Sequence, residues 1–135
     1  MPTLYLHAGL MITALLSALT GASIAIIFRR RRWWLLYHRL LEIGAVLMIV
    51  GGFAAAIGMI VLSGEEHFAT LHARFGLTTA LMAIATICLG FLQLSRRIKK
   101  TARPAFRELH RWSGRVTLAL LAVSALSGLR LAGIV

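Results

Sequence analysis

Acidic residues are scarce in this sequence of 135 residues, which has four Asp and Glu against 15 Lys and Arg. Cysteine and proline are also rare, with one and two residues. The single cysteine, Cys88, excludes a disulfide within the chain and gives no indication of a redox compartment. Pro104 prevents one continuous helix from running through its segment, because proline has no backbone N–H to donate.

Three long stretches contain no Asp, Glu, Lys or Arg, and they cover residues 1–28, 43–64 and 75–95. Each has about the 20 residues that a helix needs to cross a bilayer. A fourth apolar segment carries three arginines and covers residues 110–133. The composition is 59% hydrophobic and the mean hydropathy is +0.84. A soluble domain of this length cannot bury that much apolar surface.

We therefore predict an all-α fold, an integral membrane four-helix up-and-down bundle that forms a single domain over residues 1–135. The expected helices cover about residues 4–28, 33–62, 67–95 and 105–133. No basic residue precedes the first apolar segment, and its charged cluster follows it. A signal peptide has the opposite order, so we expect this segment to be a retained helix.

The positive charge lies beside the apolar segments. In a soluble protein a net charge of +11 would suggest nucleic-acid binding. Here the charge adjoins predicted spans, which excludes nucleic acid and favours contact with a lipid bilayer. Of the 15 Lys and Arg, 13 fall beside the first and third connections, and the other two are Arg74 and Arg130. Short basic loops stay cytoplasmic, so we predict non-cytoplasmic N and C termini, in a plasma membrane or a bacterial inner membrane.

Four of the five histidines stand near the start of the four predicted spans, one on each. Because successive spans are antiparallel, His7 and His72 should lie at one depth, and His38 and His110 at another. Two histidines at equal depth on separate helices can bind a haem iron from both sides. The sequence therefore predicts two haem b groups, with the irons about 20–25 Å apart along the helices.

The third and fourth spans share a repeat. Glycines follow the two histidines by four residues, at Gly76 and Gly114, and by eighteen residues, at Gly90 and Gly128. A glycine four positions on lies on the same helix face, where a flat macrocycle can rest against the backbone. The alternative interpretation is close packing between membrane helices, which also favours glycine.

Charged residues accompany the histidines at the predicted cytoplasmic end. We expect Arg39, Arg111 and Arg115 to pair with haem propionates, although arginines also reach membrane interfaces without a ligand. Glu42 lies one turn after His38 and is predicted to pair with one of these arginines, or to adjust a haem potential. The alternative for Glu42 is a buried ion pair without a function.

The fifth histidine, His67, is expected in a loop. A zinc site made of Glu65, Glu66 and His67 is an alternative, but no tetrahedral set of ligands is visible.

In these residues the chain resembles the cytochrome b561 family, over almost its whole length. The resemblance rests on His7 with Met11 and Gly21, on the Tyr37–His38–Arg39 step, and on the two histidines followed by glycine after four residues. It implies a four-helix core with two b haems, one bound by His7 and His72 and the other by His38 and His110. It also implies transmembrane electron transfer, often from ascorbate to monodehydroascorbate or ferric iron.

The predicted function is electron transfer across a membrane through two bis-histidine haems. Ascorbate, a quinone or a redox protein are the candidate donors and acceptors, and a transmembrane reductase and a homodimer are left open. One alternative is a haem-bearing anchor subunit of a partner dehydrogenase or quinone reductase. The other is a haem-free structural bundle.

Overall fold

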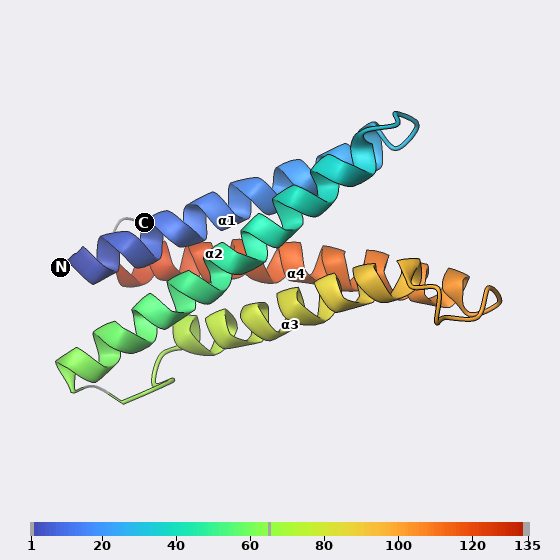
Figure 1. Ribbon diagram of the computed structural model, residues 1–135. Helices are drawn as coiled ribbons and strands as arrows, with labels where there is room; N and C mark the ends of the chain where they lie inside the picture. Colours follow the sequence, from blue (N-terminus) through green and yellow to red (C-terminus); the bar gives the residue numbers. More distant parts are fainter. Residues whose placement is uncertain (1, 65, 134–135) are drawn as a thin grey trace.

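The computed structural model describes residues 2–64 and 66–133, and four long helices make up most of this chain (Figure 1). They are α1 (Pro2–Ile27), α2 (Trp34–Ser63), α3 (Leu71–Leu94) and α4 (Arg103–Leu131). Each is long and apolar enough to cross a membrane. The predicted all-α bundle of four membrane-spanning helices is therefore confirmed.

The start of α3 differs from the prediction by four residues. We expected this helix to begin at residue 67, but Phe68 has a left-handed backbone with φ of 62°. Thr70 is extended, and its side chain accepts a hydrogen bond from the backbone N–H of Ala73 at 3.2 Å. This N-cap fixes the start of α3 at Leu71, so His72 is only the second residue of the helix.

The start of α4 differs in the opposite direction. The prediction placed it after Pro104, at residue 105, whereas the helix begins at Arg103 with the proline in its first turn. Proline is tolerated there because the first N–H groups of a helix have no partner within the helix. At 29 residues α4 is about 43 Å long, so it exceeds the hydrocarbon thickness of a bilayer.

The bundle consists of two helix hairpins. Helix α1 packs closely along α2, and α3 packs closely along α4, whereas α2 with α3 and α1 with α4 have far fewer contacts. Within the described ranges, the diagonal pairs α1 with α3 and α2 with α4 have no close backbone contact. The hairpins separate toward the end that carries the α1–α2 and α3–α4 connections (Figure 1). The interior between the hairpins is therefore packed much less tightly than each hairpin.

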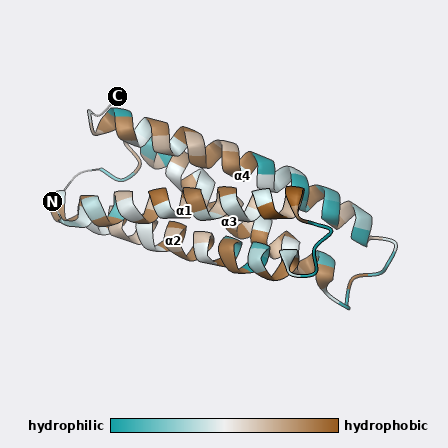
Figure 2. Cartoon of the chain, turned by 90° about the horizontal axis from the view of Figure 1, so that it is seen from above, coloured by the Kyte–Doolittle hydropathy of each residue, from teal (hydrophilic) through white to brown (hydrophobic). Residues whose placement is uncertain are grey.

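Small residues allow the close approach within the hairpins. Most members of the buried core are alanines, and the core comprises Ala14, Ala18, Ala45, Ile49, Ala80, Ala83 and Leu121. Small side chains let membrane helices approach each other closely. The large apolar side chains lie on the outside instead, as expected for helices whose outer faces contact lipid. Figure 2 shows that α4 is most hydrophilic next to the α3–α4 connection.

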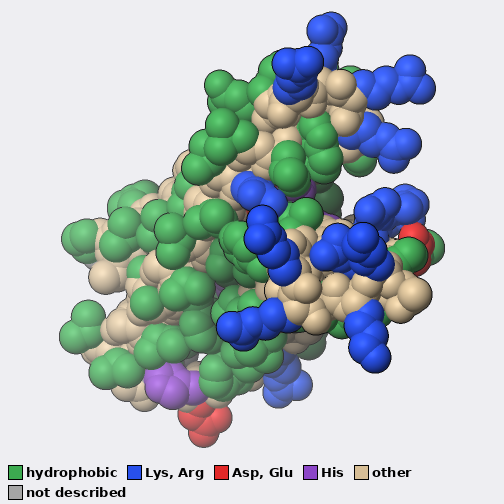
Figure 3. All heavy atoms as spheres, turned by 45° about the vertical axis from the view of Figure 1, so that its right-hand side comes forward, with side chains coloured by type: hydrophobic (Ala, Val, Ile, Leu, Met, Phe, Trp, Pro, Cys, Tyr) green, Lys and Arg blue, Asp and Glu red, His purple; other side chains and the backbone are tan. Residues whose placement is uncertain are grey.

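Lys and Arg gather at the end of the bundle that carries the α1–α2 and α3–α4 connections (Figure 3). Helix α1 begins and α4 ends at the opposite end, together with the α2–α3 connection (Figure 1). This arrangement agrees with an up-and-down chain. The assignment of the basic end to the cytoplasm stays a prediction from the distribution of Lys and Arg.

Two hydroxyl pairs, one buried and one partly buried, join α3 to α4. The hydroxyls of Thr79 and Ser124 are 3.0 Å apart, and those of Thr86 and Thr117 are also 3.0 Å apart. The hydrocarbon core of a bilayer contains no water, so each pair supplies the hydrogen bond that water would otherwise provide to these hydroxyls.

The variant Thr79→Val should lower the stability of the bundle by about 1 kcal/mol, because it leaves the buried Ser124 hydroxyl without its partner. Thermal unfolding in detergent micelles would measure the change. The matched control is Thr20→Val, which removes a hydroxyl that bonds only to its own helix at an exposed position. Equal effects of the two variants would contradict a stabilising role for the pair.

Candidate functional site

Four histidines meet as two pairs between the hairpins. The ring centres of His7 on α1 and His72 on α3 are 5.9 Å apart, with the rings at 85°. Those of His38 on α2 and His110 on α4 are 6.2 Å apart, with the rings at 73°. All four side chains are half-buried. Each pair therefore joins two diagonal helices, across the loosely packed interior.

Each histidine is held by a backbone carbonyl of the other helix in its own hairpin. Nδ1 of His7 donates to Gly52 O at 2.7 Å, and Nδ1 of His38 donates to Gly21 O at 3.0 Å. In the second hairpin the acceptors, both at 3.0 Å, are Ser124 O for His72 and Thr86 O for His110. A ring whose Nδ1 carries the proton has its free lone pair on Nε2. All four rings therefore have one nitrogen left to bind a metal.

The four bonds follow one spacing. Every acceptor lies fourteen residues after the histidine of its own helix, as Gly21 follows His7 and Gly52 follows His38. Within each hairpin the two histidines thus bond to each other's helix reciprocally. Fourteen residues of helix span about 21 Å, which is the separation of the two histidine levels along the bundle. This value falls in the range that the sequence predicts for the two irons.

The residues whose carbonyls accept these hydrogen bonds were not predicted from the sequence. Only the repeat shared by the third and fourth spans could have indicated them. Thr86 and Ser124 both stand fourteen residues after their histidines in the third and fourth spans. In the first hairpin the same positions are glycines, and the side chain four residues after each histidine packs onto them. A Cβ at Gly52 would lie 2.9 Å from Sδ of Met11, and one at Gly21 would lie 2.7 Å from Oε1 of Glu42.

Gly90 and Gly128 are the glycines that lie against histidine rings. A Cβ at Gly128 would lie 2.8 Å from Cε1 of His72, and a Cβ at Gly90 would lie 3.1 Å from Cε1 of His110. Any larger residue would push the ring away from its carbonyl acceptor. These glycines therefore give the imidazoles room to approach the partner helix of the hairpin.

Gly76 and Gly114, which we expected beside a macrocycle, differ from each other. Gly76 is buried, yet among the described residues no atom beyond its chain neighbours and the local helix backbone lies within 4 Å of the position that a Cβ would occupy. This open space beside His72 fits a bound planar group. At Gly114 a Cβ would lie 3.8 Å from Cγ2 of Thr86, so this glycine lies at an ordinary contact distance from α3.

The three arginines predicted to bind a cofactor have different surroundings. Arg39 is half-buried, and in the described part of the chain its buried Nε has no hydrogen-bond partner. Arg111 pairs with Glu108 at 3.2 Å, and both side chains are exposed. The guanidinium of Arg115 lies 4.8 Å from the ring centre of Trp112. Arg39 is therefore the one of these three whose buried nitrogen lacks a partner.

We had expected Glu42 to pair with an arginine, but its partner is a histidine. Across residues 2–64 and 66–133 its carboxylate has one ionisable partner, Nδ1 of His38, at 3.6 Å. The two residues are one helical turn apart, so they lie on the same face of α2. This contact keeps an acidic group next to one histidine pair.

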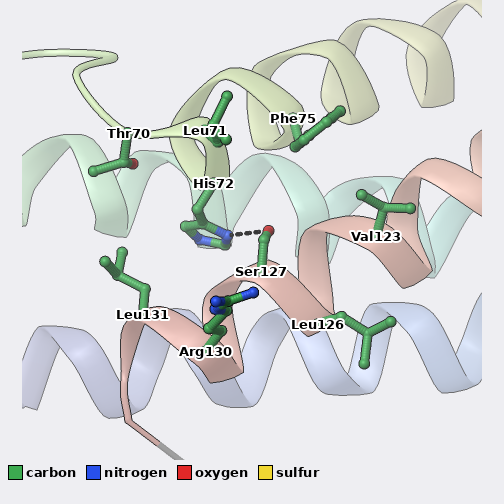
Figure 4. Close-up of a pocket in the computed structure, with 9 residues that line it drawn as sticks. All are labelled: Thr70, Leu71, His72, Phe75, Val123, Leu126, Ser127, Arg130 and Leu131. Carbon is green, nitrogen blue, oxygen red and sulfur yellow. Dashed lines mark hydrogen bonds between the residues drawn. The ribbon is translucent and has the colours of Figure 1, made fainter. Parts of the chain in front are cut away.

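A cleft of about 680 Å³ opens beside His72 between α3 and α4 (Figure 4). Its polar lining includes Ser127, whose hydroxyl accepts a second hydrogen bond from Nδ1 of His72 at 3.2 Å. Arg130 lines the same cleft, and Figure 4 shows its side chain directed toward His72. The sequence had marked Arg130 only by its position, so the structure adds a basic group at the level of His7 and His72.

The geometry of the histidine pairs suits one metal ion between the two rings. Metal–nitrogen bonds to histidine are about 2 Å long, so two rings on one ion have centres roughly 6 Å apart. Among the described residues, no group of three or more His, Cys, Asp or Glu could hold a metal. Each pair thus fits a metal whose other ligands come from elsewhere, as in a porphyrin. Of the alternative zinc site, Glu65 lies outside the described residues and His67 is exposed beside Phe68.

Comparison with known families gives one match. A family model described as eukaryotic cytochrome b561 matches residues 6–134 of the chain. No curated protein and no solved structure matches it.

Proposed function

Starting from the fact that this chain belongs to the cytochrome b561 family, and is thus a haem-containing, multi-pass membrane protein of electron transfer, we propose that it binds two b haems through its four paired histidines. His7 and His72 would hold one haem, and His38 and His110 would hold the other. The single observation that carries this proposal is that two pairs of histidine rings, each pair from diagonal helices, lie with their centres about 6 Å apart.

The loose interface between the hairpins supports this assignment. A flat group between His7 and His72 must lie between diagonal helices, and these have no close backbone contact in the described ranges. The open space at Gly76 provides further room at the same level. The Nδ1–carbonyl bonds orient the rings and strengthen their metal binding, as outer partners of metal ligands do.

Basic residues near each pair suit the propionates. At the level of His38 and His110, the buried Nε of Arg39 has no partner among the residues that the structure describes. At the level of His7 and His72, Arg130 lies in the cleft beside His72. Charge-assisted hydrogen bonds from arginine to carboxylate are stronger than neutral ones. We assign Arg39 and Arg130 as the partners of the carboxylates in the two sites.

The proposed ligand sets restrict the chemistry. When bound, a b haem supplies a one-electron redox centre. Two histidines at each site would hold the iron, so the protein would leave no coordination site for a substrate or for oxygen. Its residues orient the cofactor, exclude water and separate the two levels by about 21 Å of helix. We propose that electrons enter at one end of the bundle and leave at the other, through different partners at the two ends.

A visible spectrum of the purified protein tests the proposal. We expect a haem-to-protein ratio of about two and sharp bands of low-spin, six-coordinate haem in the reduced-minus-oxidised spectrum. Carbon monoxide should leave the reduced spectrum unchanged, because both axial positions are occupied. A protein without haem absorbance would indicate the alternative of a structural bundle. A spectrum that responds fully to carbon monoxide would contradict the paired ligands.

A further inference from the structure

His7 and His38 have matched backbone partners, but they differ in the side chain that stands four residues further along the chain. In the first hairpin, His7 and His38 each donate to a glycine carbonyl on the opposite helix. The residue four positions after each histidine then packs onto that glycine. This residue is Met11 after His7 and Glu42 after His38. A neutral thioether thus occupies the position at one level that a carboxylic acid occupies at the other.

Glu42 is held close to the imidazole of His38 by the packing around it. Its Oε1 is 3.6 Å from Nδ1 of His38 and would lie 2.7 Å from a Cβ added at Gly21. No arginine forms an ion pair with Glu42 in the described part of the chain. The side chain is 28% exposed, so its charge is only partly screened by solvent. In the second hairpin, Gly76 and Gly114 stand at the equivalent positions and bring no charge.

We propose that Glu42 is a positioning residue that lowers the midpoint potential of the haem bound by His38 and His110. The inference rests on the proposed function, because it needs a haem at this pair. A negative charge beside the imidazole favours the oxidised iron, which carries one more positive charge than the reduced iron. The carboxylate also attracts the Nδ1 proton of His38, which makes the ring a stronger electron donor to the metal.

The experiment exchanges the two side chains. Glu42→Met gives the His38 level the residue found at the His7 level, and Met11→Glu does the reverse. Potentiometric titration should show two one-electron steps in the unmodified protein. Glu42→Met should raise one midpoint potential and leave the other unchanged. Met11→Glu should lower the midpoint potential that Glu42→Met leaves unchanged.

Glu42→Gln separates charge from shape, because it keeps the size and the hydrogen-bonding oxygen of the side chain. It should raise the same midpoint potential as Glu42→Met. If Glu42→Gln has no effect while Glu42→Met does, the charge is not the cause and the inference is wrong. Unchanged potentials in both variants, with two haems still bound, would overturn the inference and leave the proposed ligands in place. An unmodified protein without haem would overturn the proposed function itself.

Discussion

Replacing His72 with leucine is expected to reduce the haem content from about two to about one per chain. The variant leaves His7 without its partner, while His38 and His110 keep both rings and both carbonyl bonds. A haem with one axial histidine is bound more weakly and presents an open coordination position. The measurement is the haem-to-protein ratio, together with the response of the reduced spectrum to carbon monoxide.

Two further variants make this result specific. His7→Leu removes the other ligand of the same pair from a different helix, so it should give the same single-haem spectrum as His72→Leu. His67→Leu is the matched control, because this exposed histidine lies outside both pairs and its removal should leave two haems. Loss of both haems, or of neither, in a folded His72→Leu protein would show that the pairing is incorrect.

The second large effect is expected from a single methyl group at Gly128. In Gly128→Ala the new Cβ would lie 2.8 Å from Cε1 of His72, closer than carbon atoms pack. The ring cannot turn aside without losing the hydrogen bonds from Nδ1 to Ser124 and Ser127. We therefore expect loss of the haem at His7 and His72, measured as about half of the original haem content.

Helix propensity alone predicts the opposite outcome for this substitution. Alanine is more favourable than glycine within a helix by up to about 1 kcal/mol. Gly58→Ala is the control, because Gly58 lies in α2 with no atom within 4 Å of its Cβ position, and this variant should keep both haems. A Gly128→Ala protein with two haems and unchanged potentials would refute the steric role of the glycine.

The helices and their order could be predicted from the sequence because a bilayer imposes a simple requirement. A span must be long, apolar and helical, and this pattern is visible in the three stretches without charge. The start of α3 was less predictable, since it depends on the left-handed Phe68 and on the cap that Thr70 provides. Both are local backbone features with a weak signal in hydropathy.

The histidine pairs could also be expected from residue order, because antiparallel helices bring matched positions to one depth. Their acceptors could not. A backbone carbonyl is present at every residue, so composition does not show which one receives the Nδ1 hydrogen bond. The first hairpin hides the repeat further, because Gly21 and Gly52 stand where the second hairpin has Thr86 and Ser124. Only the shared spacing of fourteen residues relates the two hairpins.

The positions of the arginines relative to the histidine pairs could not be predicted from the sequence. Arg39, Arg111 and Arg115 all lie near a histidine in the sequence, yet Arg111 and Arg115 have partners of their own on the exposed face of α4. Arg130 is far from His72 in the chain and close to it in space. Closeness in the sequence therefore does not show which arginines lie close to a histidine in space, because the direction of a side chain depends on the rotation of its helix.

The order of events during membrane insertion follows from the way the contacts are divided between the two hairpins. Each hairpin completes its own histidine–carbonyl bonds, so it can form once its two helices have left the translocon. In contrast, each histidine pair needs one residue from the first hairpin and one from the second. His7 can meet His72 once α3 is inserted, but His72 gains its acceptor, Ser124, only with α4, and His38 must also wait for α4. Both levels should thus be completed only when the last helix enters the membrane.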